Sequence, residues 1–262
     1  MGQKETLVSV IIPYYRSNDT IDRALESIFK QSIKNYEIII IDDFSNRKID
    51  TEKLLEINNY NKVKVIFLNE NIGPGGARNI GISKATGEYI AFLDSDDAWK
   101  SNKLELQLEI MKKYNAFISG HHSAIKGERE HHNIEIKSIS KYKQLITNYF
   151  PTRSVMIKNE GQYKFLDSMR YAEDYLLWTQ IILEGKRAIY INKTLSNSFK
   201  EDFGEAGLTA SLKNMHEGVI DTFQILYHEK KLTFAEFIIL KSMERVKYAR
   251  RIIIKNSRDN KK

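Results

Sequence analysis

Apolar residues in the first hundred positions fall into four continuous runs separated by segments with helical spacing. The runs cover residues 7–13, 36–41, 62–69 and 89–93. Continuous runs rich in β-branched residues are typical of strands buried on both faces. The first intervening segment predicts an amphipathic helix capped by Asn18 or Asp19. Its apolar positions recur at spacings of three and four residues, at Ile21, Ala24, Leu25, Ile28 and Phe29.

Two further helices, over residues 47–60 and 77–85, fit between the later runs. Strands that alternate with helices in this way predict an α/β fold with a Rossmann-like, mostly parallel sheet flanked by helices. The Gly-Pro-Gly-Gly segment at 73–76 predicts a turn before the last helix. Ligand-binding groups of such folds gather at the carboxyl ends of the strands.

The second half of the chain has a less regular pattern. It predicts helices over 104–114 and 174–183, strands over 117–123, 155–157 and 188–191, and a hairpin or loop over 126–137. The segment 197–209 is rich in glycine and charge, which predicts a lid.

Composition is that of a globular protein with one large domain or a domain with an extension. The 262 residues are 42% hydrophobic and 29% charged. No apolar run approaches the roughly 20 residues that span a bilayer, and the first residues lack a signal-peptide pattern. The chain has no cysteine, so thiolate metal sites and disulfides are excluded and a cytoplasmic location is expected.

Positive charge is concentrated at the end of the chain. Residues 241–262 hold nine basic and two acidic residues, a net +7 that equals the formal charge of the whole chain. The first 240 residues are therefore balanced, and no nucleic-acid partner is expected. The segment 232–255 mixes apolar and basic residues, which fits either a helix on an anionic membrane surface or a helix packed on the domain with a solvated basic face.

An acidic cluster follows the strand at 89–93. It contains Asp94, Asp96 and Asp97 within four residues, and carboxylates this close raise one another's pKa unless a cation neutralises them. Oxygen ligands favour Mg²⁺ or Mn²⁺, so the cluster predicts a metal site, with a solvated acidic turn as the alternative. Zinc binding by the histidine pairs at 121–122 and 131–132 is disfavoured, because adjacent residues on a strand point to opposite faces.

Four motifs in this order resemble the family 2 glycosyltransferases with a GT-A fold. They are VSVIIPYY at 8–15, YEIIIIDDFS at 36–45, NIGPGGARNIGISKATGEYIAFLDSDD at 71–97 and AEDYLLW at 172–178. The resemblance covers about residues 6–210. It implies a single GT-A domain over 1–210, with a nucleotide-sugar-binding half at 1–100 and an acceptor-binding half at 101–210. A helical basic extension would follow at 211–262.

The resemblance also implies roles for residues of the nucleotide-binding half. Pro13 and Tyr15 match positions that line a uracil pocket, and Asp43 matches the carboxylate that accepts a hydrogen bond from uracil N3. Turn capping is the structural alternative for Asp43. Gly75 and Gly76 match positions where the backbone approaches the nucleotide.

Arg78 matches the cation near the nucleotide, with a helix-surface role as the alternative. Asp94 matches the carboxylate that contacts ribose, and Asp96 the one that binds Mn²⁺ or Mg²⁺. Asp97 has two open readings, as a metal ligand through water or as the cap of the following helix.

On the acceptor side, Asp174 matches the general base and Glu173 a residue that positions the acceptor. Helix capping by Asp174 is the alternative. For His216, approach to the diphosphate or metal is weighed against a helix-surface role, which is favoured.

The implied function is inverting transfer of a sugar from a nucleotide donor, expected to be a UDP-sugar, to a hydroxyl of a glycan or lipid-linked acceptor. The product would be a surface polysaccharide such as capsule, O-antigen or lipopolysaccharide, made by a peripheral enzyme at the cytoplasmic face of the inner membrane. Two alternatives remain open from the sequence. One is a metal-dependent nucleotidyltransferase on a similar sheet, and the other is a non-enzymatic basic adaptor for membrane or nucleic acid.

Overall fold

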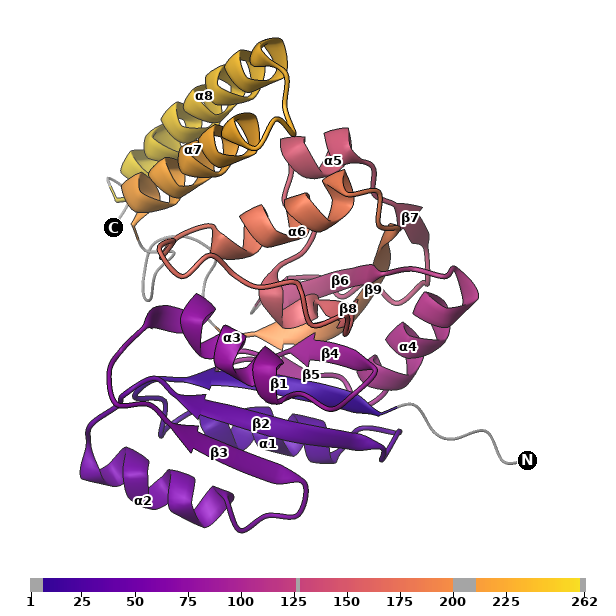
Figure 1. Ribbon diagram of the computed structural model, residues 1–262, viewed down its shortest axis with the longest axis vertical. Coiled ribbons are helices and arrows are strands. Elements are labelled where there is room, and N and C mark those ends of the chain that lie inside the picture. Colours follow the sequence, from indigo (N-terminus) through magenta and orange to yellow (C-terminus); the bar gives the residue numbers. More distant parts are fainter. Residues whose placement is uncertain (1–6, 126–127, 200–210, 260–262) are drawn as a thin grey trace.

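A mixed nine-stranded sheet forms the centre of the computed structural model, which describes residues 7–125, 128–199 and 211–259 (Figure 1). The first four strands are parallel in the order β3-β2-β1-β4. They are β1 Val8–Tyr14, β2 Tyr36–Asp42, β3 Val63–Phe67 and β4 Tyr89–Phe92. The four predicted strands and their parallel pairing are therefore confirmed.

Beyond β4 the sheet changes direction. β8 (Met156–Lys158) is antiparallel to β4 and to β6 (Ile118–Ile125), while β6 is parallel to β9 (Ala188–Ser198). The short strands β5 (Ala98–Trp99) and β7 (Ile136–Ser138) are antiparallel to β9. β9 is longer than predicted and takes in residues 197–198 of the expected lid; positions 200–209 of that lid lie outside the described residues.

Helices cover both faces of the sheet, because alternate residues of each central strand point to opposite sides. Val8, Val10 and Ile12 of β1 pack with α1 (Ile21–Phe29), α2 (Lys48–Ile57) and α4 (Lys103–Lys113). Ile11 packs on the other face with α3 (Gly73–Lys84) and α6 (Glu173–Leu183). This double burial explains why the runs in the sequence are continuous.

Two predicted helix starts are wrong. Thr20 precedes α1 and no side chain caps this helix, so neither Asn18 nor Asp19 is its cap. α3 begins at Gly73, so the Gly-Pro-Gly-Gly segment is the first helical turn; Pro74 suits it because this turn needs no proline N–H. Further along α3, a Cβ on Gly81 would lie 2.5 Å from Ile11 Cγ2, so this glycine lets the helix approach β1 closely.

The expected helical extension is present as α7 (Leu212–His228) and α8 (Phe234–Asp259), which lie side by side at the end of the molecule opposite α2 (Figure 1). They pack on α6 and on α5 (Lys141–Ile146) through a third apolar cluster. Tyr175, Phe223 and Leu240 belong to it. Within the described ranges, no helix is long and apolar enough to cross a membrane.

His121 on β6 is completely buried. Its Nδ1 donates to the carbonyl oxygen of His122 at 2.9 Å, since a carbonyl can only accept, and its Nε2 has no hydrogen-bond partner. Burial, with a smaller contribution from the nearby Lys103 charge, holds the pKa of His121 well below its ordinary value of 6.5. The imidazole is therefore neutral in the folded protein, as a buried group without an anionic partner should be.

Exchange of His121 for Asn should remove one source of acid sensitivity. Below pH 6.5 the unfolded chain protonates this histidine and the folded chain does not, so its effect on stability is unfavourable and grows as the pH falls. Each pH unit below 6.5 should lower the relative stability of the wild type by up to about 1.36 kcal/mol for as long as the buried imidazole stays neutral.

Urea unfolding at about pH 7.5 and about pH 5 measures this difference. The loss of stability on acidification should be smaller in His121→Asn than in the wild type, and unchanged in His228→Gln, whose side chain is exposed. Parallel pH curves for His121→Asn and the wild type would contradict the assignment.

Candidate active site

A cavity of about 1160 Å³ opens at the carboxyl ends of the parallel strands and continues to α7 and α8. Its wall brings together residues that are far apart in the sequence. All but two of the predicted site residues line it, namely Pro13, Tyr15, Asp43, Arg78, Asp94, Asp96, Asp97, Glu173 and Asp174.

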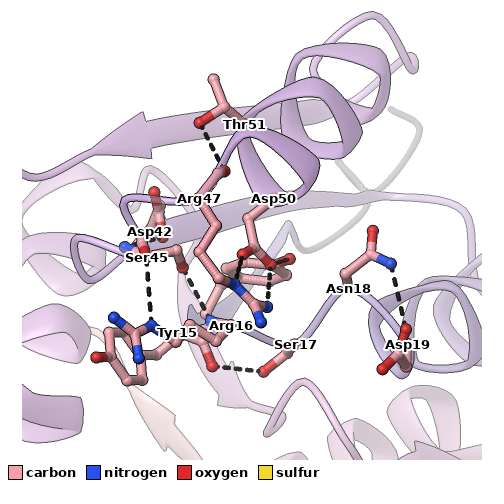
Figure 2. A network of polar contacts seen from close by, with 11 residues as sticks. Tyr15, Arg16, Ser17, Asn18, Asp19, Asp42, Ser45, Arg47, Asp50 and Thr51 are labelled. Carbon is pink, nitrogen blue, oxygen red and sulfur yellow. Dashed lines mark hydrogen bonds and ion pairs between the residues drawn. The ribbon is translucent and has the colours of Figure 1, made fainter.

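The two loops that carry Tyr15 and Asp43 are tied together by polar contacts (Figure 2). The backbone N–H of Arg16 donates to Ser45 Oγ at 2.9 Å, and the N–H of Ser45 donates to Asp42 Oδ1 at 3.1 Å. Beneath them, the buried Tyr14 hydroxyl donates to Asp50 Oδ1 at 2.5 Å. These contacts hold the ends of β1 and β2 in a fixed relative position.

Tyr15 is 44% exposed, and the Arg16 guanidinium lies 4.9 Å from the centre of its ring. Asp43 is nearly buried, and its two carboxylate oxygens accept from the N–H groups of Ile72 at 2.7 Å and Gly73 at 3.0 Å. These bonds tie Asp43 to the start of α3, whereas the bond within the local turn is the one that the N–H of Ser45 donates to Asp42. Burial raises the pKa of Asp43, while each oxygen keeps a further lone pair for a ligand.

Gly75 and Gly76 lie in α3 and are not among the described residues that line the cavity. A Cβ on Gly75 would lie 3.1 Å from Glu173 Cγ, and one on Gly76 would lie 2.9 Å from Ile72. Both glycines therefore serve close packing of α3, and the expectation that their backbone meets the nucleotide has no support in this geometry.

Arg78 is buried between two carboxylates. Its Nη2 donates to Asp94 Oδ1 at 2.7 Å and its Nη1 to Glu173 Oε1 at 3.1 Å. Burial lowers the pKa of Arg78, but the charges of Asp94 and Glu173 outweigh this effect and raise it above its ordinary value. The prediction that Arg78 lies on the helix surface is wrong, because only 5% of this residue is exposed.

Glu173 and Asp174 are the first two residues of α6 and also line the cavity. Burial, with the neighbouring charge of Asp174 as a smaller cause, raises the pKa of Glu173 to about 7. Asp174 is half-buried and accepts from the N–H of Tyr175 at 2.7 Å and from Thr152 Oγ1 at 3.1 Å. The residue in the cap position is Ala172, so the capping reading of Asp174 is wrong.

Asp97 is 2% exposed, and its Oδ2 lies 3.8 Å from Arg153 Nε. Its Oδ1 is buried without a hydrogen-bond partner. Burial raises the pKa of Asp97 to about 7, with Arg153 opposing and Asp94 and Asp96 adding to the rise. Asn102 precedes α4, so Asp97 does not cap that helix.

These features fit a divalent cation, which would satisfy the orphaned Asp97 oxygen and offset the repulsion with Asp96. Among the described residues, no three His, Cys, Asp or Glu side chains form a complete metal site. A cation at Asp96 and Asp97 would therefore need further ligands, such as phosphate oxygens and water.

The other histidines have structural partners. His122 stacks on His131 with ring centres 4.1 Å apart, and His216 Nδ1 lies 3.3 Å from Glu244 Oε1. His216 also stacks on Tyr248 at 4.3 Å, so it joins α7 to α8 and is not among the described residues lining the cavity.

Sequence reasoning missed several cations of the cavity wall. Arg153 and Arg170 line it, and so do Lys247 and Arg251 of α8. Arg153 lies in a short 3-10 helix (Thr152–Ser154) and Arg170 in a loop, both without a recognisable motif. The other two were counted only as part of the basic tail.

The arrangement is that of a sugar-nucleotide transferase with a GT-A fold. A crystal structure of residues 1–349 of TarS from S. aureus, in complex with UDP-GlcNAc, superposes with a TM-score of 0.70. The alignment covers 89% of this chain and 70% of that one at 22% identity, which shows a common fold.

The chain belongs to glycosyl transferase family 2, whose model matches residues 9–165. An uncharacterized glycosyltransferase from Haemophilus influenzae is 32% identical over 86% of this chain and 90% of its own length. The Escherichia coli enzyme WfgD, a UDP-Glc:α-D-GlcNAc-diphosphoundecaprenol β-1,3-glucosyltransferase, is 33% identical over 67% of this chain and 70% of its own. The chain spans only 26% to 30% of three longer relatives from Rickettsia.

Removal of the Arg78 charge should destabilise the fold strongly. Arg78→Gln leaves Asp94 and Glu173 without their shared cation, and breaking a buried ion pair in this way costs about 3–5 kcal/mol. Urea unfolding measures the loss. The double variant Arg78→Gln/Glu173→Gln should recover part of it, because one uncompensated carboxylate is then gone.

Lys84→Gln, in the last turn of the same helix, serves as the control because its side chain is exposed. If Arg78→Gln and Lys84→Gln change the free energy of unfolding equally, the Arg78 network does not hold the two walls together.

Proposed function

We propose that the chain transfers a sugar, with inversion, from a UDP-sugar to a hydroxyl of a glycan or lipid-linked acceptor in surface-polysaccharide synthesis. The observation that carries this proposal is that Asp96, Asp97 and Asp174, which are far apart in the sequence, line one cavity. We expect the first two to face Asp174 across the donor sugar. The name of the E. coli relative, which includes a UDP-sugar and a lipid diphosphate, supports both substrate classes. A Bacillus subtilis relative, 34% identical, is named a putative teichuronic acid biosynthesis glycosyltransferase.

The donor would bind at the ends of β1, β2 and β4. Pro13 and Tyr15 offer flat surfaces for the base, and the free lone pairs of Asp43 can accept from its N–H. Asp94, whose Oδ1 lies 2.7 Å from Arg78 Nη2, would accept a hydrogen bond from the ribose hydroxyl. These contacts leave the sugar directed toward the α6 side of the cavity.

Asp174 would act as the base. An inverting displacement needs a proton acceptor opposite the leaving group, within hydrogen-bond reach of the attacking hydroxyl. Thr152 and the N–H of Tyr175 orient the Asp174 carboxylate. Burial raises the pKa of Asp174, which makes the carboxylate a stronger base than an exposed aspartate. Glu173, held by Arg78, positions its neighbour instead of touching the acceptor.

Asp96 and Asp97 would hold Mn²⁺ or Mg²⁺. When bound, such an ion supplies charge neutralisation for the departing diphosphate. When no ion is bound, Arg153, at 3.8 Å from Asp97, compensates part of the negative charge of the carboxylate cluster. The nucleotidyltransferase and adaptor alternatives are set aside, because the chain belongs to a glycosyltransferase family.

Nucleoside diphosphate release with Mn²⁺ or Mg²⁺ present, followed over a panel of sugar nucleotides, tests the proposal. Asp174→Asn should lower kcat for transfer by about 10²-fold or more, because a general base contributes that much, and should leave the donor KM near its wild-type value. Asp96→Asn should abolish the stimulation of transfer by Mn²⁺ or Mg²⁺.

Asp221→Asn, on the exposed side of α7, provides a matched Asp-to-Asn control with wild-type kinetics. Full transfer activity in Asp174→Asn would rule out the assigned base, and metal-independent activity in the wild type would rule out the assigned ion.

The outer face of α8 is proposed to lie on an anionic membrane. Ile239, Val246 and Ile253 recur every seven residues and are 57%, 71% and 65% exposed. Arg245 and Arg250 are exposed on the same helix. A helix with an exposed apolar stripe and flanking cations suits an anionic bilayer surface. The proposal gives each face of the helix one of the two predicted roles.

Val246→Glu should weaken co-sedimentation with vesicles that contain phosphatidylglycerol. It removes an apolar contact and adds a repelled charge, together about 2 kcal/mol or more than tenfold in affinity. Leu55→Glu on α2, where Leu55 is 53% exposed, is the matched control and should bind as the wild type does. Equal losses in both variants, or none in Val246→Glu, would overturn the assignment of this face.

A further inference from the structure

The cavity extends well past the residues that the donor and the reaction require. Beyond Asp174 its wall is formed by α5, α7 and α8 and is mainly apolar. Met215, Val219 and Phe223 come from α7, and Leu240 and Met243 from α8. We call this part the helical arm of the cavity.

The helical arm lies next to the proposed base. α7 contacts the residue three positions before Asp174, since a Cβ on Gly218 would lie 2.5 Å from the carbonyl oxygen of Tyr171. Asn214 Nδ2 also donates to the Tyr171 hydroxyl at 2.9 Å. A molecule in the arm can therefore reach the Asp174 carboxylate without passing through the donor site.

Two cations of α8, one helical turn apart, also line the arm. Arg251 donates through Nη1 and Nη2 to the two oxygens of Glu244, at 3.1 and 3.3 Å, which fixes the plane of its guanidinium. Lys247 donates to the carbonyl oxygen of Ile146 at the end of α5. Arg251 has three further N–H donors, and Lys247 has two.

An apolar wall beside fixed cations matches an amphiphile with an anionic head. A free sugar would gain nothing from five apolar side chains, and a neutral lipid would leave the remaining N–H donors of the two cations unused. Phosphate is the head group that a planar guanidinium and an ammonium bind best. The single carboxylate among them, Glu244, is already shared by Arg251 and His216.

We propose that the helical arm is the acceptor subsite, in which Lys247 and Arg251 bind the diphosphate of a lipid-linked acceptor and the α7–α8 apolar residues receive the start of its lipid chain. This inference rests on the proposed function, which sets the orientation of the acceptor by placing its sugar at Asp174. It gives α8 two working faces, an inner one that binds the acceptor and an outer one toward the membrane.

Binding of farnesyl diphosphate and of farnesol to the full chain, by calorimetry in the presence of EDTA, tests the subsite without any transfer reaction. EDTA removes the divalent cation that would otherwise draw the diphosphate to Asp96. The wild type should bind farnesyl diphosphate at least about tenfold more tightly than farnesol.

In Lys247→Met/Arg251→Gln this preference should fall to within about twofold, because the head group has lost its partners. Phe223→Ala should weaken both ligands by a similar factor, since it alters only the apolar wall. Lys213→Met/Lys230→Met removes two exposed cations near the same helices and should bind as the wild type does.

The subsite is overturned if the wild type shows no preference for the diphosphate, or if the control pair loses it as the Lys247/Arg251 pair does. Thermal unfolding of each variant separates a lost site from a lost fold, and the single variant Arg251→Lys should retain most of the binding. Absence of donor turnover in the wild type, with the preference intact, would refute the proposed function and leave the phosphate-binding arm standing.

Discussion

The Arg78 guanidinium, held between Asp94 and Glu173, is the contact on which the geometry of the active site depends. It joins the end of β4 to the start of α6. Arg78 and Glu173 are 95 residues apart in the sequence. A buried guanidinium and a buried carboxylate are stable together only when their charges are compensated, and the partly exposed Asp94 adds to this compensation. The Arg78 contacts bring the end of β4 and the start of α6 together at one cavity, and Asp174 follows directly after the residue that Arg78 holds.

Charge compensation is incomplete at the neighbouring residue Asp97. Asp97 has only a distant Arg153 as its counter-charge, and one of its oxygens has no hydrogen-bond partner. A polar group left in this state costs stability, and such costs are often found at functional sites. Arg78 has two carboxylate partners within 3.1 Å, whereas Asp97 has one cation at 3.8 Å, and this difference separates the residues that hold the site together from the residue suited to a cation.

The central strands could be predicted because the signal is local. Val8, Val10 and Ile12 pack on one face and Ile11 on the other. Because both faces are buried, the strand has an almost continuous run of apolar residues in the sequence. Short strands such as β5 and β7 carry too few residues for a period to show. The cavity wall contributed by α7 and α8 could not be foreseen, since its residues meet the rest only through tertiary packing. The close packing of Gly75 against Glu173 is of the same kind, because the two residues are remote in sequence.

A crystal structure with an intact, non-hydrolysable UDP-sugar analogue and Mn²⁺ tests the central claim most directly. The account predicts the ion at Asp96 and Asp97, the Arg78 contacts to Asp94 and Glu173 preserved, and the anomeric carbon of the sugar facing the Asp174 carboxylate. A donor sugar directed away from Asp174, or an Arg78 that leaves Glu173 to bind the diphosphate, would contradict it.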